Sequence, residues 1–258
     1  GGKSMLAIER RNAILEKLQI ERRVVVSELS ELYDVSEETI RRDLDKLEND
    51  GFAIKSYGGA VINENANLDL PFNVRKNRNV LGKQKIAELI SNMINDGECI
   101  ILDASSTAVA IAKAIKDKKD MTVITNSVEI VIELLETPEC KVISTGGVAT
   151  SGSFALVGPL TDRAIQSYYA DRAIISSKGL DLKNSFSDSD ELHANNKKTM
   201  LECAKQKILA IDHSKFGKIG FSKIGSLNDI TTVVTDEKPE EEWLRKLNRL
   251  GVECIYPE

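Results

Sequence analysis

The chain has 258 residues, of which 41% are hydrophobic and 29% are charged. These proportions are typical of a folded soluble protein, and the length predicts two domains, because a domain usually takes about one to two hundred residues. No apolar run reaches the roughly 18 residues of a membrane span, and the sequence shows no signal-peptide pattern. We therefore expect a cytoplasmic protein that does not bind a membrane.

The formal net charge is −5 at pH 7. Residues 1–60 carry ten Lys and Arg against twelve Asp and Glu, which gives 10 − 12 = −2. The overall charge therefore does not indicate nucleic-acid binding. Contact with DNA would depend on where the cations lie, because phosphates need only a local cluster of Lys and Arg.

Two helices are expected near the start of the chain. The first covers residues 9–19, and a shorter one follows with Ser27 as its N-cap. Residues 34–36 then form a turn that is too short to let the second and third helices separate. This spacing is typical of a helix-turn-helix.

Residues 35–50 predict a third helix with one apolar side and one polar side. Ser36 stands at the N-cap, and Gly51 stands where a left-handed residue ends a helix. The apolar stripe consists of Ile40, Leu44 and Leu47. The opposite side presents Thr39, Arg42 and Lys46, with Arg41 flanking them.

A β-hairpin is expected next, with strands at residues 52–56 and 60–62 joined by a turn at residues 57–59 whose two glycines supply a positive φ. An amphipathic helix alone is more often ordinary core, but a helix-turn-helix followed by such a wing predicts DNA binding. The predicted DNA-contacting residues are Ser36, Glu38, Thr39, Arg41, Arg42, Lys46, Lys55, Tyr57 and Gly58.

The predicted domains are a winged helix-turn-helix at residues 5–62, a linker at 63–76 and an α/β domain at 77–258. The linker is placed where periodicity is lost. In the third segment, helical stretches alternate with short β-branched runs, which predicts a mostly parallel sheet covered by helices. The expected strands are Glu98–Leu102, Thr122–Thr125, Lys141–Ser144, Arg172–Ile175, Lys207–Ile211 and Thr232–Thr235.

Polar residues follow these runs, at the carboxyl end of each expected strand, where parallel sheets bind ligands. Residues 103–107 lead directly into a helix, whose N-terminus favours an anion. Helix capping is the structural alternative for each position. The candidate ligand-binding residues are Asp103, Ser105, Ser106, Thr107, Thr125, Asn126, Ser127, Gly146, Gly147, Lys178, Gly179 and Lys215.

Metal binding is not expected. The cysteines are scattered without a C-x-x-C pair, so they indicate free thiols, and His193 and His213 stand apart from them. We predict no metal and no cofactor.

The first part of the chain resembles the helix-turn-helix signature of the DeoR family of bacterial transcription regulators. The positions that carry this resemblance are Arg10, Ile14, Leu18, Ser36, Thr39, Ile40, Arg41, Arg42, Asp43 and Leu44. The remainder is similar to the effector domain of the same family, which resembles ribose-5-phosphate isomerase in fold and binds phosphorylated sugars.

The resemblance places Arg75 and Lys83 at the family's linker Arg and first-helix Lys, and implies that Lys83 contacts the effector. Residues 103–107 stand at its D-x-G-T-T loop, with Ser105 and Ser106 in place of Gly and Thr. Its T-N-S, double-glycine and D-x-S-K-F motifs correspond to residues 125–127, 146–147 and 212–216.

Two functions remain open at this point. In the first, the protein represses a carbohydrate catabolic operon, binds operator DNA as a homodimer or homotetramer, and responds to a phosphorylated sugar. In the second, it is an isomerase-like enzyme in which Asp103, Glu191 or Asp212 acts as base beside Lys215. The DNA-binding region argues against an enzyme. In the regulator, Glu191 would contact the effector instead of acting as a base, and we expect it in the effector site.

Overall fold

The computed structural model describes residues 5–63, 71–150, 152–183 and 185–258. Contacts divide the chain into two units, residues 1–78 and residues 79–258. Among the described residues, no helix is both long and apolar enough to cross a membrane.

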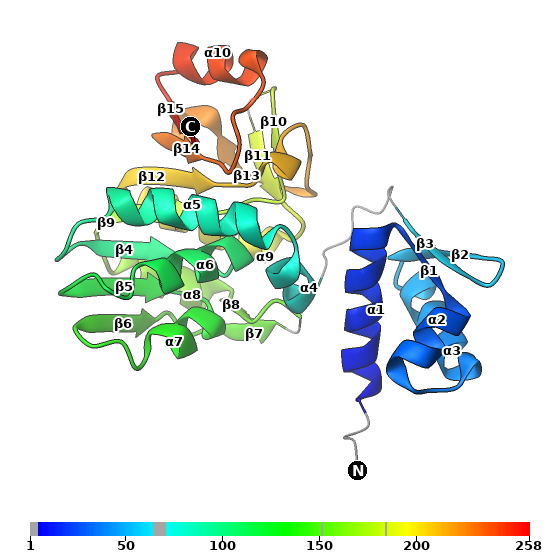
Figure 1. Cartoon of the computed structure of the whole chain (residues 1–258). Helices are drawn as coiled ribbons and strands as arrows, with labels where there is room; N and C mark the ends of the chain where they lie inside the picture. The colour runs from blue at the N-terminus through cyan, green and yellow to red at the C-terminus, as the bar shows by residue number, and fades with distance from the viewer. Residues whose placement is uncertain (1–4, 64–70, 151, 184) are drawn as a thin grey trace. The chain divides into compact units, whose positions relative to one another are not determined.

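The first unit is a winged helix-turn-helix, as predicted (Figure 1). Its strands pair in the order β1-β3-β2, and both pairs are antiparallel. The elements are α1 (Ala7–Glu21), β1 (Arg23–Val25), α2 (Val26–Tyr33), α3 (Glu37–Asn49), β2 (Ala53–Ser56), β3 (Gly59–Ile62) and α4 (Phe72–Asn77).

The predicted apolar stripe of α3 forms the centre of this unit. Ile40, Leu44 and Leu47 are at most 4% exposed and pack with Leu15 and Leu18 of α1. Burying one such side chain stabilises a fold by about 1.5–3 kcal/mol. The stripe therefore fixes which side of α3 remains outside.

The start of α2 differs from the prediction. The helix begins at Val26, one residue before Ser27, and its N-cap is Val25 at the end of β1. The Val26 N–H donates to the Gly58 carbonyl at 2.8 Å. The wing therefore accepts the first backbone N–H of α2, and the helix starts one residue earlier than a Ser27 cap would allow. Strand β1, which has only three residues, was not predicted.

The segment predicted as a linker contains a helix. Residues 64–70 lie outside the described part of the chain, but Phe72–Asn77 form α4. Phe72 and Val74 are at most 2% exposed, and the Asn77 amide donates to Glu16 of α1 at 3.3 Å. These apolar residues, spaced by two in a short segment, were too few to show a helical period.

The second unit is built on a seven-stranded sheet in the order β15-β14-β12-β9-β4-β5-β6. Every neighbouring pair is parallel. The six predicted strands are all present, while the edge strand β15 was not predicted. The bounds are β4 (Cys99–Leu102), β5 (Met121–Thr125), β6 (Cys140–Ser144), β9 (Ala170–Ile175), β12 (Ala204–Ala210), β14 (Thr232–Val234) and β15 (Glu253–Ile255).

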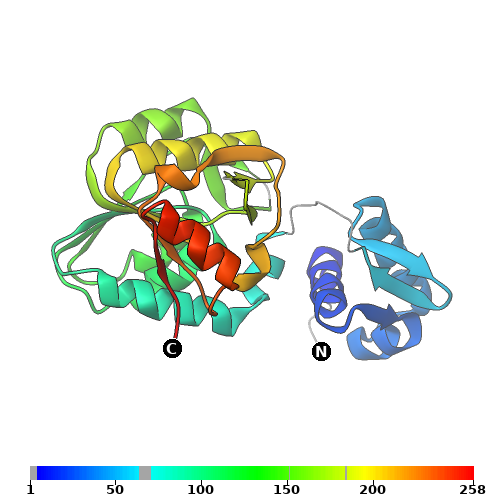
Figure 2. The same cartoon turned by 90° about the horizontal axis from the view of Figure 1, so that it is seen from above.

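Helices cover both faces of this sheet, with α5, α6 and α7 on one face and α8 and α9 on the other (Figure 2). The helices are α5 (Val80–Met93), α6 (Ser106–Ala114), α7 (Val128–Leu134), α8 (Pro159–Gln166), α9 (Glu191–Glu202) and α10 (Glu241–Arg249). Smaller elements are the hairpin of β7 (Val148–Thr150) with β8 (Ala155–Val157), the antiparallel sheet of β10 (Gly179–Asp181), β11 (Ser185–Asp188) and β13 (Ser222–Ser226), and the 3₁₀ helices His213–Lys215 and Leu227–Asp229.

A buried ion pair connects α1 to α3. Arg10 Nε lies 2.6 Å from Asp43 Oδ2, and the two side chains are 8% and 4% exposed. Removing one member of a buried pair leaves the other charge uncompensated, which usually costs about 3–5 kcal/mol.

We predict that Asp43→Asn lowers the free energy of unfolding of the first unit by about 3–5 kcal/mol, because Arg10 loses its buried partner. Glu21→Gln removes the exposed i,i+4 pair of α1 with Lys17 and should leave the free energy of unfolding close to the wild-type value. Hydrogen–deuterium exchange of α1 and α3 in increasing urea measures both. Equal losses in the two variants would contradict the role of the pair.

Candidate functional site

The outer side of α3 carries the cations that the sequence predicted for DNA contact. The side chains of Arg41, Arg42 and Lys46 are 52%, 76% and 56% exposed. Ser36 caps the helix, because its hydroxyl accepts the Thr39 N–H at 3.2 Å. The N-terminal end of a second helix with this exposure is the part that contacts base edges in helix-turn-helix proteins.

Each of these cations has an acidic neighbour. Arg41 lies 2.6 Å from Glu37 and Arg42 lies 3.4 Å from Glu38. Lys46 lies 2.9 Å from Asp50. These pairs are exposed, so each contributes at most about 1 kcal/mol to stability.

The wing places Lys55 beside this helix and Tyr57 at its turn. Lys55 contacts Asp45 of α3, and its backbone N–H donates to Glu48 at 2.8 Å. Tyr57 is fully exposed at the turn. Of the two glycines, Gly58 has φ +78°, whereas Gly59 belongs to β3 and is needed because a Cβ there would lie 2.0 Å from the Val24 carbonyl oxygen.

The polar loops of the second unit meet at one edge of the sheet, because all seven strands run in the same direction. After β4 the chain continues to β5 and β6 on one side, and then returns to β9 on the other side of β4. A parallel sheet binds ligands at such a reversal of strand order, beyond the carboxyl ends of the strands. The loops after β4 and β9 border this point.

The loop after β4 is closed by hydrogen bonds within the chain. Ser105 is the N-cap of α6 and accepts the Ala108 N–H at 3.0 Å, while its hydroxyl donates to Asp103 at 2.5 Å. Ser105, Ser106 and Thr107 are each less than a tenth exposed. The capping role expected as an alternative is therefore present for Ser105.

The loop after β5 contains a buried acceptor. Thr125 donates its hydroxyl to the Leu102 carbonyl at 2.8 Å, and Ser127 caps α7. Asn126 is 3% exposed and donates its amide to the Leu156 carbonyl at 2.9 Å. Its Oδ1 accepts no hydrogen bond from the part of the chain that the structure describes, and a buried acceptor normally has a partner.

The two glycines after β6 have different surroundings. Gly147 has φ +126°, and a Cβ there would lie 2.2 Å from Thr161 Oγ1 of α8. Gly146 has φ +65°, is exposed, and accepts a hydrogen bond from Thr161 at 2.8 Å through its carbonyl. Gly147 is thus required by the packing of α8, while Gly146 lies at the surface.

The remaining predicted residues are spread along the edge. The group reaches from Gly146 after β6 to Lys215 after β12, which is four strand spacings or about 19 Å. Gly179 lies in β10, and a Cβ there would lie 2.2 Å from the Lys218 carbonyl oxygen. Lys83 is buried in α5, Lys178 is half-buried before β10, and Glu191 is exposed at the start of α9. One small ligand cannot contact all of these positions.

Comparison with known proteins agrees with both halves of this description. The DeoR-like helix-turn-helix domain matches residues 10–66, and the DeoR C-terminal sensor domain matches residues 78–237. The HTH-type transcriptional regulator YulB of Bacillus subtilis is 42% identical over 232 residues, covering 90% of each chain. The chain belongs to the DeoR family.

Two further similarities accompany this membership. The glycerol-3-phosphate regulon repressor of Escherichia coli is 28% identical, covering 91% of this chain and 93% of the repressor. A solved ribose-5-phosphate isomerase A from Methanocaldococcus jannaschii aligns with a TM-score of 0.40 and 16% identity, covering 53% of this chain and 55% of the isomerase. The DeoR-family relatives identify a DNA-binding regulator rather than an enzyme.

The sequence did not predict a buried charge cluster in the second unit of this DeoR-family chain. The cluster lies beneath the sensor edge, which is the edge of the sheet where the loops after the carboxyl ends of the parallel strands meet. Lys197 of α9 contacts Asp188, lies 3.2 Å from Asp103 Oδ2 and donates to the Ser176 carbonyl at 2.9 Å. Asp103 also accepts the Ser176 N–H at 2.9 Å, so its carboxylate connects β4, β9 and α9. A sequence signal was present, because Lys197 lies at helical spacing between the apolar Ala194 and Leu201.

The pKa values of Asp188 and Lys197 show that these two groups stay charged at neutral pH. Burial raises the pKa of Asp188, but the nearby Lys197 ammonium outweighs burial and holds it at about 2. Burial lowers the pKa of Lys197, and the two carboxylates more than compensate and raise it. The Asp188 contribution to stability is therefore present above pH 3.8 and is lost as the pH falls through about 2.

A second charged group joins the end of β14 to the start of α5. Asp236 accepts Asn79 Nδ2 at 2.9 Å, the His213 backbone N–H at 2.7 Å and His213 Nδ1 at 2.9 Å. The hydrogen bond to Asp236 raises the pKa of His213. His213, Asp236 and Glu237 each have a possible metal-ligand atom, and these three atoms lie within 4.8 Å of one another. The sequence spacing did not predict this cluster. Asp236 therefore holds Asn79, the first residue of the second unit, at the end of β14.

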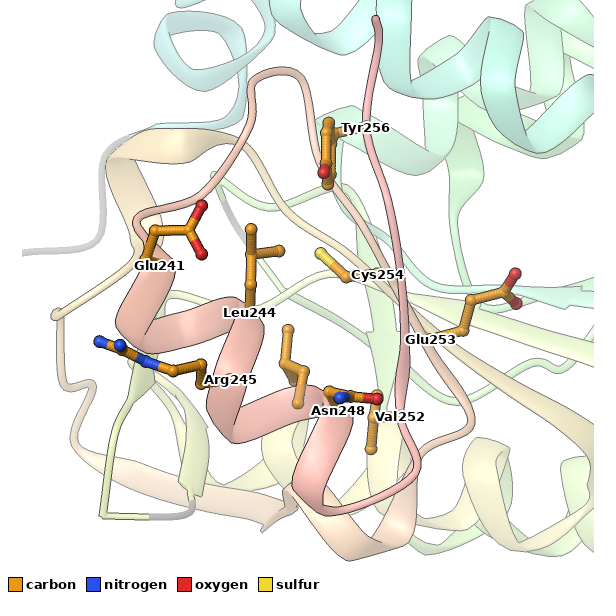
Figure 3. Close-up of a pocket in the computed structure, with 9 residues that line it drawn as sticks. Glu241, Leu244, Arg245, Asn248, Val252, Glu253, Cys254 and Tyr256 are labelled. Atoms are coloured by element: carbon orange, nitrogen blue, oxygen red, sulfur yellow. The ribbon is translucent and has the colours of Figure 1, made fainter.

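A hollow of about 410 Å³ lies elsewhere, between α10 and β15 (Figure 3). Its lining includes Leu244, Arg245, Cys254 and Tyr256, and none of the predicted sensor residues. Burial raises the pKa of Cys254 to about 11, which keeps its thiol protonated at neutral pH.

We predict that Lys197→Met lowers the free energy of unfolding of the second unit by about 3–5 kcal/mol, because Asp103 and Asp188 then share a buried site without a cation. Lys198→Met alters the exposed neighbour and should change it by less than about 0.5 kcal/mol. The single tryptophan, Trp243, lies in this unit and reports its urea unfolding by fluorescence. Similar stability of the two variants would contradict the structural role of Lys197.

Proposed function

We propose that this DeoR-family regulator represses a carbohydrate operon, and that a phosphorylated sugar bound by its second unit changes its affinity for operator DNA. The observation that carries this proposal is the presence, in one chain, of a helix-turn-helix whose α3 exposes three cations and a parallel sheet whose polar loops meet at a reversal of strand order. The first feature suits DNA and the second suits a small anionic ligand.

The DNA contact would be made by the outer side of α3 and by the wing. Arg42 is the most exposed of the α3 cations that the sequence predicted, and it lies opposite the buried stripe. Tyr57 and Lys55 extend the same unit to the wing. Cations placed in this way would contact base edges and phosphates despite the negative charge of the whole chain.

The ligand would bind near Thr107, at the start of α6, and Asn126, in the loop after β5; these segments follow the neighbouring strands β4 and β5. The N-terminus of α6 offers backbone N–H groups to a phosphate. The buried Asn126 Oδ1 lacks a donor among the described residues and would accept a sugar hydroxyl. The similarity to the glycerol-3-phosphate regulon repressor supports a phosphorylated ligand of this kind.

The active form would be a homo-oligomer, either a dimer or a tetramer. The reading helix, α3, covers one half-site of the operator. Two-fold symmetry places the two copies of α3 about one helical turn of DNA apart. The second unit would hold the copies together. A monomer would bind operator DNA too weakly to control transcription.

We predict that Arg42→Ala weakens binding to a duplex that the wild-type protein selects from a randomised pool by about 1–3 kcal/mol, or roughly 5- to 150-fold. Arg245→Ala removes an exposed arginine of α10 and should leave the affinity unchanged. A gel-shift titration at fixed salt measures both. Equal affinities for Arg42→Ala and the wild-type protein would exclude this docking side.

We predict that Thr107→Ala and Asn126→Ala each raise the sugar-phosphate concentration needed for half of the effect on DNA binding by about tenfold, because each variant loses one hydrogen bond to the ligand. The probes are glycerol, pentose and hexose phosphates in turn. Thr231→Ala changes a threonine at the opposite edge of the same sheet and should keep the wild-type response. If the first two variants respond like the wild-type protein, the ligand binds elsewhere.

A further inference from the structure

The reading helix is acidic overall. From Glu37 to Asn49, α3 contains five acids and three cations, which gives 3 − 5 = −2. Affinity for DNA of any sequence comes mainly from Lys and Arg that replace counterions along the phosphates. Carboxylates on the same surface oppose this affinity, so a carboxylate that faces the DNA would gain from a donor on a base edge and not from a phosphate.

Glu38 and Arg42 form the outermost pair of α3. Successive residues turn by about 100° around a helix, so both side chains lie about 160° from the buried Ile40, on either side of the outermost line. They are 63% and 76% exposed, and Arg42 Nε lies 3.4 Å from Glu38 Oε1. A carboxylate and a guanidinium therefore stand side by side on the part of α3 that would enter a DNA groove.

A C·G base pair offers the complementary arrangement in the major groove. The cytosine N4 amino group is a donor, and the guanine O6 and N7 atoms next to it are acceptors. A carboxylate accepts from the former and a guanidinium donates to the latter. Phosphates and the thymine O4 atom are acceptors alone, so they would repel Glu38.

We propose that the Glu38–Arg42 pair reads one C·G base pair of each half-site as a unit, with Glu38 accepting from cytosine and Arg42 donating to guanine. The inference rests on the DNA-binding function proposed above and assigns the base chemistry of the same helix. Glu38 also lowers the affinity for sites that place thymine or guanine at the cytosine position, because its carboxylate then faces an acceptor.

The chain contains a matched control for this pair. Glu37 and Arg41 have the same chemistry and spacing, and their contact is 2.6 Å. They lie about 60° and 100° from Ile40, on the flank of α3 rather than at its outermost line. Neutralising Glu37 therefore changes the net charge of α3 equally without altering the outermost pair.

The test is selection of duplexes from a randomised pool by the full chain, as wild type, Glu38→Gln and Glu37→Gln. Wild type and Glu37→Gln should enrich the same C·G pair in each half-site, and replacing that pair by T·A should weaken wild-type binding about 5- to 150-fold. Glu38→Gln should lose most of this preference. It should also bind a scrambled duplex about twofold more tightly, since one exposed acid is neutralised.

Three results would overturn the inference. They are a wild-type half-site without a fixed C·G pair, a Glu38→Gln variant that keeps the wild-type preference, and a Glu37→Gln variant that loses it to the same extent. The proposed function fails separately, if the wild-type protein enriches no duplex at all. Circular dichroism of each variant shows whether the exposed substitutions leave α3 folded.

Discussion

The buried contact between Arg10 and Asp43 holds the DNA-reading helix in place. The two charges are 2.6 Å apart, and their side chains are 8% and 4% exposed. If α3 moved relative to α1, each charge would be buried without its partner, which is costly. The pair joins α1 to the side of α3 that also carries Ile40 and Leu44, so the helix cannot rotate without exposing both charge and apolar surface. This constraint leaves the outer side of α3 free for recognition.

The second unit depends on a similar buried charge arrangement. Lys197 lies between Asp103 and Asp188 at the point where β4 and β9 meet, which is where the order of the strands reverses. Because all three groups are paired, they stabilise the base of the sensor edge. The proposed ligand contacts are nearer the loops, at Thr107 and at the Asn126 Oδ1 atom, which has no hydrogen-bond donor among the described residues.

Sequence periodicity predicted most of the fold, because apolar stripes and β-branched runs record which side of each element is buried. It predicted α3, the wing and six of the seven strands of the parallel sheet. It did not predict β1 or β15, which have three residues each. The equally short β14 was predicted because it lies within the β-branched run at residues 230–235. Charged partners were also missed, since nothing in the spacing of Arg10 and Asp43, or of Lys197 and Asp103, says that they meet in space.

The predicted sensor residues show a related limit. Their position after parallel strands correctly placed them at one edge, but it could not separate ligand contacts from helix caps and packing glycines. Ser105 caps α6 and Gly147 makes room for α8, and both roles depend on neighbours that are distant in the sequence.

The most direct test of the account is the structure of the full chain bound to its selected operator duplex. The account predicts that α3 lies in the major groove, with Arg42 within hydrogen-bond distance of a base edge and the Arg10–Asp43 pair intact behind it. A complex in which the outer side of α3 faces solvent, while another surface contacts the DNA, would contradict it.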